Sequence, residues 1–182
     1  MDNGSQDFIS ADAFRHGMRH VPTVVTIVTM GDDEGVQGVT IGSFVSLSMD
    51  PPLVCFNVQK SISIHDRIVE AKGFAIHVLR EKQSIVSDWF ARSDVKAGEQ
   101  FEAYDYEISE TGAPLLKDCL VRFECESYRI LPGGDHSILV GKVISIMEGN
   151  SGRPIVYHQR AYHGVGEHIA DHEHKSRAAA GK

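Results

Sequence analysis

The chain has 182 residues, a length that fits one domain of ordinary size. Apolar residues make up 42% and charged residues 24%, which is the balance of a globular protein that buries its own core. The net charge of −7 argues against broad binding to nucleic acid or to an anionic membrane, so any phosphate site has to be local.

Cysteine usage and hydropathy bear on the compartment. Cys55, Cys119 and Cys125 form no CxxC pair, and two of them lie in apolar runs that are typical of strands. No secretory leader opens the sequence, and no apolar run approaches the ~18 residues of a membrane span. We therefore expect a cytoplasmic protein with reduced thiols, bound to neither nucleic acid nor membrane.

The predicted elements follow from hydrophobic spacing and from turn residues. In chain order they are a helix over 7–20 with Asp7 or Ser10 as its cap, strands over 22–30, 36–48 and 53–59, a helix over 61–73, a strand over 74–79, a helix over 81–93, and strands over 121–131, 137–149 and 155–166. Residues 94–118 have no clear period and are expected to be rich in loops.

Strands outnumber helices, and most follow one another through turns instead of helical crossovers. This order indicates a mainly β (α+β) protein in which an antiparallel sheet closes into a barrel, with a few short helices. We expect one domain over 7–166, a disordered N-terminus over 1–6, and a flexible polar tail over 167–182.

Several common sites are missing from the sequence. There is no GxxxxGK[ST] and no GxSxG, and "HGVGEH" (163–168) lacks the third glycine of a dinucleotide fingerprint. The histidines and acids near the end are His168, Asp171, His172, Glu173 and His174. Little apolar material surrounds them to fix a ligand geometry, so we predict no metal site.

The stretch "TIGSFVSLSMDPPLV" (40–54) is unusually small and polar for a strand. If it were one continuous strand, one face would carry Thr40, Gly42, Phe44, Ser46 and Ser48. A solvent-facing strand would explain such a face. A glycine there also suits the close approach of a backbone or a ligand, and the prolines leave backbone N–H groups without ladder partners. A flat ligand with hydrogen-bonding edges is therefore the second interpretation.

A second polar group follows at the end of the next strand. Asn57, Lys60, Ser61 and Ser63 lie where a strand ends and a helix is predicted to begin. Hydroxyls, a lysine and free N–H groups suit a phosphate, whereas a simple serine N-cap is the alternative. Together, the two stretches would suit a long ligand with a flat ring at one end and a phosphate at the other.

The order and spacing of five blocks resemble the short-chain flavin reductases, which supply reduced flavin to two-component monooxygenases. The blocks are "PTVVTIVT", "GVTIGSFVSLSMDPPLV", the N-x-x-K-S segment, "GGDHSILVGKV" and "PIVYHQRAY", and the resemblance spans residues 12 to 166. It implies a split-barrel, FMN-binding fold and a homodimer with the flavin near the subunit interface.

The resemblance also implies roles for particular residues. Flavin contacts are expected from Thr40, Ile41, Gly42, Ser43, Ser46, Asn57, Lys60, Ser61, Ser63 and Tyr162, with the first five along the ring and the lysine and serines at the phosphate. His136 is expected to contact the nicotinamide. Gly42 stands where many relatives carry a polar residue, and Gln159-Arg160-Ala161 replaces an arginine-glycine pattern.

The function expected from this resemblance is an NAD(P)H:flavin oxidoreductase. It would reduce FMN or FAD with NADH or NADPH, NADH being favoured, and pass free reduced flavin to a monooxygenase by diffusion. One alternative is a non-catalytic FMN carrier or sensor on the same scaffold; another is a relative of the pyridoxamine-phosphate oxidases. The Gly-Gly-Asp-His turn at 133–136 favours the reductase, because a carrier has no need of it.

Overall fold

The structure is a computed structural model, and it describes residues 9–170. Its helices are α1 (Ala11–Met18), α2 (His65–Glu70) and α3 (Ser84–Phe90), with the 3-10 helix η1 (Glu99–Phe101). Its strands are β1 (Thr23–Val24), β2 (Thr26–Asp32), β3 (Gly35–Ile41), β4 (Val45–Met49), β5 (Pro52–Gln59), β6 (Gly73–Val78), β7 (Tyr106–Ile108), β8 (Pro114–Leu116), β9 (Val121–Gly133), β10 (His136–Glu148), β11 (Ile155–His158) and β12 (Ala161–Gly164).

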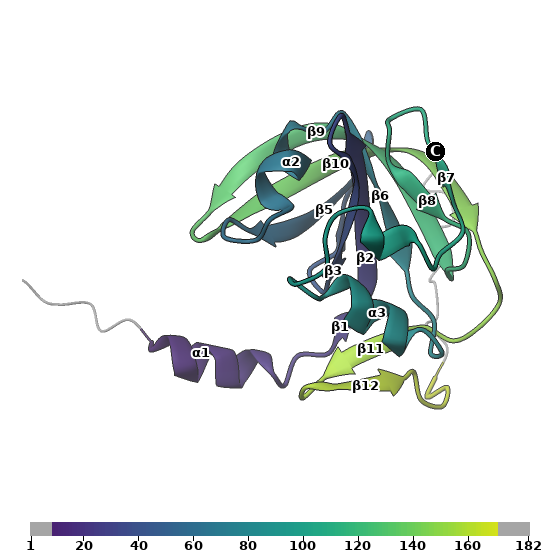
Figure 1. Cartoon of the computed structure of the whole chain (residues 1–182). Coiled ribbons are helices and arrows are strands. Elements are labelled where there is room, and N and C mark those ends of the chain that lie inside the picture. Colours follow the sequence, from purple (N-terminus) through teal and green to yellow (C-terminus); the bar gives the residue numbers. More distant parts are fainter. Residues whose placement is uncertain (1–8, 171–182) are drawn as a thin grey trace, which may run out of the picture.

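A seven-stranded antiparallel sheet forms the body, in the order β3-β2-β6-β9-β10-β5-β4. Two smaller sheets, β1-β11-β12 and β7-β8, complete the fold (Figure 1). The mainly β, antiparallel prediction is confirmed, with short helices between strands. The predicted closure is wrong in one respect: β3 and β4 are both edges, so the large sheet curls into a split barrel without joining its ends.

Two larger hydrophobic clusters hold the body together; β2 contributes to both and β6 to the first, and the side chains of these two strands are almost all buried. In one cluster Phe56 meets Phe74 edge to face, with ring centroids 5.0 Å apart. In the other, Phe90 of α3 packs against Phe101 of η1 at 5.2 Å. Strands buried on both faces read as continuous β-branched runs, which is why the sequence predicted them well.

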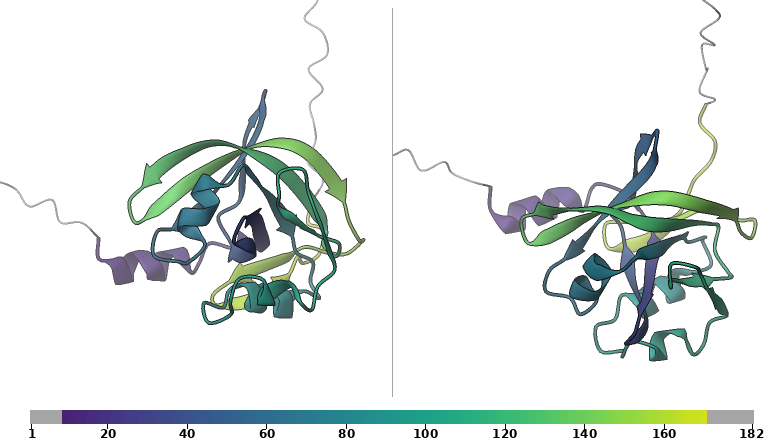
Figure 2. Two further views of the ribbon diagram at one scale, coloured as in Figure 1. Left: turned by 45° about the horizontal axis from the view of Figure 1, so that its top comes forward. Right: turned by 90° about the horizontal axis from the view of Figure 1, so that it is seen from above.

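The longest hairpin, β9–β10, arches across the top of the molecule, with α2 beneath one arm and β7–β8 beneath the other (Figures 1 and 2). Its register shifts at Val140/Gly141 and again at Val143/Ser145, and such bulges bend a ribbon. Gly141 lies against the core, where an added Cβ would come within 2.4 Å of the Phe74 ring. A glycine is needed there for the bent ribbon to close on the core.

The predicted strand over 36–48 is wrong, and the error matters for the site. β3 ends at Ile41, residues 42–44 form a bend, and β4 begins at Val45. β3 pairs with β2 at one edge of the sheet, whereas β4 pairs with β5 at the opposite edge. The stretch therefore crosses the open side of the barrel, and its residues do not share one strand face.

The remaining differences concern ends and turns. The predicted helices are shorter than expected, and Ser10 is the cap of α1 because its Oγ accepts the N–H of Ala13 at 3.2 Å. Residues 155–166 form a hairpin instead of one strand, since Gln159 and Arg160 turn the chain with φ of 49° and 64°. The alternative cap Asp7 and the expectations for 1–6 and 171–182 lie outside the described residues.

Candidate functional site

Two hollows adjoin one another at the end of β3, where the barrel is split. The first, of about 450 Å³, lies between β3, α3 and the β11–β12 hairpin, and the second, of about 390 Å³, lies between β3, β5 and β10. Both are lined by Thr40, Ile41 and Gly42. The polar stretch singled out in the sequence is therefore the wall common to both hollows.

The backbone of β3 supplies hydrogen-bonding groups at this wall, because β3 is an edge strand. In an antiparallel edge, every second residue turns its N–H and C=O away from the sheet. Gly38 and Val36 do so here: the N–H of Gly38 donates to Gln100 Oε1 at 3.0 Å, and the carbonyl of Val36 accepts from Gly98. By the same alternation, the backbone groups of Thr40 face outward, toward a ligand at the strand's edge.

Gly42 has a packing reason as well as an open side. A Cβ at this position would lie 3.0 Å from Thr23 Oγ1 and 3.5 Å from Thr23 Cβ. The missing side chain thus lets β1 approach the bend that follows β3. Close approach of another chain segment is one of the two reasons that the sequence offered for this glycine, the other being a ligand.

The bend after Gly42 is tied to β5 by one side chain. Ser43 Oγ accepts the backbone N–H of Asn57 at 2.9 Å and lies 3.4 Å from the carbonyl of the same residue. Ser43 and Asn57 therefore stand side by side in the wall of the second hollow, with Ile138 of β10 beneath them. The sequence predicted both residues for the site without predicting this link.

His136 stands at the mouth of the second hollow, where β10 begins. Its Nδ1 lies 2.7 Å from a carboxylate oxygen of Asp135, and this hydrogen bond holds the pKa of that carboxyl below its usual value. A carboxylate at Nδ1 keeps a proton on that nitrogen, which leaves Nε2 directed elsewhere. The predicted nicotinamide contact therefore lies within the same hollow as the wall at residues 40–43.

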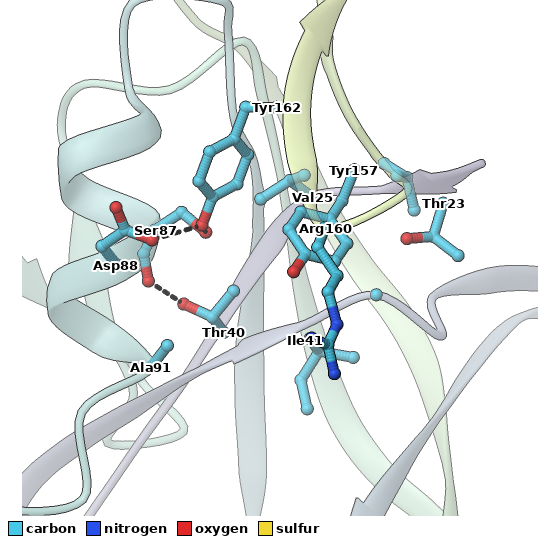
Figure 3. A pocket seen from close by; sticks show the side chains of 12 residues that line it. Thr23, Val25, Thr40, Ile41, Ser87, Asp88, Ala91, Tyr157, Arg160 and Tyr162 are labelled. Carbon is cyan, nitrogen blue, oxygen red and sulfur yellow. Dashed lines mark hydrogen bonds between the residues drawn. The ribbon is translucent and has the colours of Figure 1, made fainter. Parts of the chain in front are cut away.

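The first hollow has a polar cluster on α3 (Figure 3). The hydroxyl of Tyr162 donates to the carboxylate of Asp88 at 2.7 Å and lies 2.9 Å from Ser87 Oγ, while Thr40 Oγ1 donates to the Ser87 carbonyl at 2.6 Å. Burial raises the pKa of Tyr162, so this phenol stays protonated. Arg160 lines the same hollow from the β11–β12 turn.

The other predicted residues are dispersed. Ser46 lies on β4 at the far edge and lines neither hollow. Ser63 Oγ accepts from Gln37 Nε2 at 3.1 Å and lines a different pocket. Ser61 is exposed on the turn before α2, and α2 begins only at His65, so a helix start does not contribute to the phosphate cradle. Lys60 instead reaches the 133–136 hairpin tip, where its Nζ donates to the carbonyl of Gly134 at 2.7 Å.

Some lining residues were missed by the sequence reasoning. They are Thr23, Ser87, Asp88, Tyr157 and Arg160. Ser87 and Asp88 belong to a segment that was read correctly as a helix, but the choice of which face meets the barrel depends on tertiary packing. No sequence signal placed Arg160, because its left-handed turn contains neither Gly nor Asn.

A Ser–His–Asp chain lies close to the second hollow. Ser137 Oγ is 2.9 Å from His65 Nε2, and His65 Nδ1 is 2.7 Å from Asp66. Ser137 is buried, points to the opposite side of β10 from His136, and lines neither hollow. A buried serine cannot attack a substrate, so this chain fastens α2 to β10 instead of forming a hydrolase site.

Within residues 9–170, no three or more His, Cys, Asp or Glu side chains come together as a metal site would require. The acidic and histidine residues at 171–174 lie outside that range. In the same described part, no helix has the length and apolar character needed to cross a membrane.

The fold and the two hollows define a split barrel with a candidate ligand site at the open edge of its sheet. Residues 18–166 match the model of the flavin reductase like domain, and the chain belongs to that family.

Three comparisons show how near its relatives are. The chain is 42% identical to the NADH-dependent FMN reductase SmoA of Agrobacterium fabrum over 132 residues, 72% of this chain and 74% of that protein. It is 38% identical over 122 residues to the reductase component of the flavin-dependent trigonelline monooxygenase of Acinetobacter baylyi, which covers 66% of this chain and 38% of the longer relative. The crystal structure of BorF, the flavin reductase component of a bacterial two-component tryptophan halogenase, superposes with a TM-score of 0.80 at 30% identity, over 87% of this chain and all of BorF.

Proposed function

We propose that this protein is an NADH-dependent flavin reductase that reduces FMN or FAD and releases the reduced flavin to a partner oxygenase. The observation that carries the proposal is the second hollow, where the outward backbone of β3 and the His136 side chain border the same space. The membership of the flavin reductase family and the relatives' activities support it.

The residues at the wall fit a flavin ring. A bound flavin supplies the hydride-accepting chemistry, and the protein supplies binding and orientation. The outward N–H and C=O of Thr40 match the donors and acceptors along one edge of such a ring. Gly42 and Ser43 carry little side-chain volume, so one face of the ring stays open for a nicotinamide. N–H groups at the edge also stabilise the negative charge that accumulates on reduction.

His136 is proposed to position the nicotinamide. Hydride transfer requires the two rings to stack at about 3–3.5 Å between the reacting atoms. Asp135 fixes one nitrogen of the imidazole, so Nε2 can donate or accept toward the carboxamide of the cofactor. Because hydride transfer needs no general base, the histidine contributes binding and alignment instead of proton transfer.

The small number of cationic side chains described around the hollow suits release of the reduced flavin. Lys60 is the cation nearest the tip of the hairpin, and Arg160 borders the first hollow. A single lysine gives a phosphate a weaker grip than the bidentate arginine clusters of permanent phosphate sites. We expect micromolar affinity for flavin, about −8 kcal/mol, which permits the reduced flavin to diffuse away.

Exposed apolar side chains on β4 and on the β9–β10 hairpin support a homodimer. β4 is an edge strand with three exposed apolar side chains, Val45, Leu47 and Met49, the last 86% exposed. Tyr128, Ile130, Leu131, Ile144 and Ile146 add further exposed apolar area on the β9–β10 hairpin. An unpaired edge beside apolar side chains is typical of a surface that another chain covers.

The partner and compartment follow from chemistry. A reductase component of the kind named for BorF and for the trigonelline enzyme serves a separate oxygenase, and we propose the same division of labour here, with transfer by diffusion.

A cytoplasmic location is supported by the three free thiols; burial raises the pKa of Cys125 to about 12, which keeps that thiol protonated and inert.

The proposal is tested by following the near-ultraviolet absorbance of NADH or NADPH in air, with FMN, FAD or riboflavin added separately. Oxidation that rises and saturates with added flavin is expected, faster with NADH than with NADPH. Flavin binding by fluorescence quenching without any cofactor oxidation would contradict the proposal and favour the carrier. The hairpin tip bearing His136 is the feature that favours the enzyme over the carrier.

A further inference from the structure

Lys60 makes two contacts with the hairpin tip that carries His136. Its Nζ donates to the carbonyl of Gly134 at 2.7 Å, and its backbone N–H donates to the carbonyl of Asp135 at 2.9 Å. Lys60 follows directly after β5, so these contacts prolong the β5–β10 ladder onto the turn. The same lysine is the cation proposed for the flavin phosphate.

We propose that Lys60 couples the phosphate of the bound flavin to the nicotinamide-contacting tip, so that FMN strengthens nicotinamide binding more than riboflavin does. The inference rests on the proposed function and names the residue that connects its two subsites. In this arrangement Lys60 is a positioning residue, which acts on the nicotinamide through His136.

The tip depends on such a tie because little else holds it. Residues 131–135 are exposed, and Gly134 adopts a positive φ of 69°. The register of β10 pairs His136 with Gly133 on one side and with Gln59 on the other. A hydrogen bond with His65 holds Ser137, the residue after His136. The turn itself is held to the body by Lys60.

The hydrogen-bond donors of the Lys60 ammonium allow it to hold the tip and a phosphate together. An ammonium has three N–H donors, and the carbonyl of Gly134 takes one of them. Two donors remain for a phosphate, and hydrogen bonds between charged groups are stronger than neutral ones. The Asp135 carboxylate also feels the Lys60 charge, but this carboxylate is exposed, and an exposed pair leaves a lysine stem much of its rotamer freedom. A phosphate on the same ammonium reduces that freedom, and the Gly134 carbonyl then meets a fixed donor.

Coupling of this kind is reciprocal. If the flavin phosphate stabilises the tip that binds nicotinamide, then nicotinamide binding must tighten FMN by the same factor. Riboflavin has the same ring without the phosphate, so it serves as the matched ligand. A lysine that only fastens the turn would affect the two flavins equally.

The test is a fluorescence titration of the full-length protein with FMN and with riboflavin, each with and without saturating NAD⁺, which binds without turnover. For the wild type we expect NAD⁺ to lower the Kd of FMN by a factor about fivefold larger than that of riboflavin, the low end of measured couplings. In Lys60→Met, which keeps the apolar stem, the two flavins should respond alike. Lys82→Met is the control, because it removes one exposed positive charge away from both hollows.

Two results would overturn the inference: an equal effect of NAD⁺ on FMN and riboflavin in the wild type, or a fivefold preference that survives in Lys60→Met. NADH oxidation with riboflavin separates this failure from failure of the proposed function, because riboflavin needs no phosphate contact. If Lys60→Met still oxidises NADH with riboflavin, the reductase stands whether or not the coupling does. If the wild type oxidises no NADH with FMN, FAD or riboflavin, the proposed function fails and the inference with it.

Discussion

His77 is a fully buried histidine that fastens three strands together. From β6, its Nδ1 lies 3.1 Å from the carbonyl of Ile27 on β2, and its Nε2 accepts the N–H of Leu116 on β8 at 3.0 Å. One nitrogen therefore donates and the other accepts, which only the neutral ring can do. Burial lowers the pKa of His77 from 6.5 to about 3, so the ring remains neutral down to acidic pH.

The low pKa makes stability depend on pH in a defined direction. The unfolded chain takes up a proton at His77 near pH 6.5, but the folded chain does not. The free energy of unfolding therefore decreases as the pH falls below 6.5. The stability that depends on a neutral His77 is fully present above pH 6.5 and is lost progressively as the pH falls to about 3. Between pH 7.5 and pH 5.0 this one group lowers the free energy of unfolding by about 2 kcal/mol.

Urea unfolding at both pH values, at one protein concentration, measures the effect. His77→Gln is the matched variant, because an amide has a donor and an acceptor but no titration. We expect the wild type to lose about 2 kcal/mol more than His77→Gln on acidification. An equal loss in both proteins would refute the argument that the folded state excludes a proton from His77.

Other predictions concern packing and the two hollows. Gly141→Ala should lower the free energy of unfolding by about 1–3 kcal/mol, because its methyl group would overlap the Phe74 ring; in urea unfolding, Gly17→Ala, which meets nothing within 4 Å, is the control and should not destabilise. Tyr162→Phe should cost about 1 kcal/mol in the same assay by removing the hydrogen bond to the carboxylate on α3, and an unchanged midpoint would contradict that contact. His136→Ala should raise the KM for NADH about tenfold, the value of one good hydrogen bond, with little change in kcat in steady-state assays; a collapse of kcat at constant KM would instead assign the histidine to the chemical step.

The body of the fold could be predicted from the sequence because buried strands have a recognisable run of apolar residues. β2 and β6 are buried on both faces and are rich in β-branched and apolar residues, so their positions were evident. The long hairpin around residues 133–136 was marked by its glycines. Antiparallel order followed from short connections, whereas whether the sheet edges join depends on curvature that no local pattern encodes.

The site was only partly readable. Thr40, Gly42 and Ser43 were predicted as a ligand wall, and they line the hollows, but the predicted single strand concealed that Ser46 belongs to the opposite edge. Side-chain partners escaped prediction because they depend on distant chain segments. The pairing of Ser63 with Gln37 is one such case, since 26 residues separate them.

The proposed reductase must both reduce a flavin and release it. The most direct measurement mixes the protein with FMN and NADH without oxygen, follows the loss of the flavin's visible absorbance, and then separates protein from small molecules by rapid filtration. We expect complete bleaching of FMN in excess over protein, with reduced flavin in the filtrate. Bleaching limited to one equivalent of FMN, retained with the protein, would contradict it.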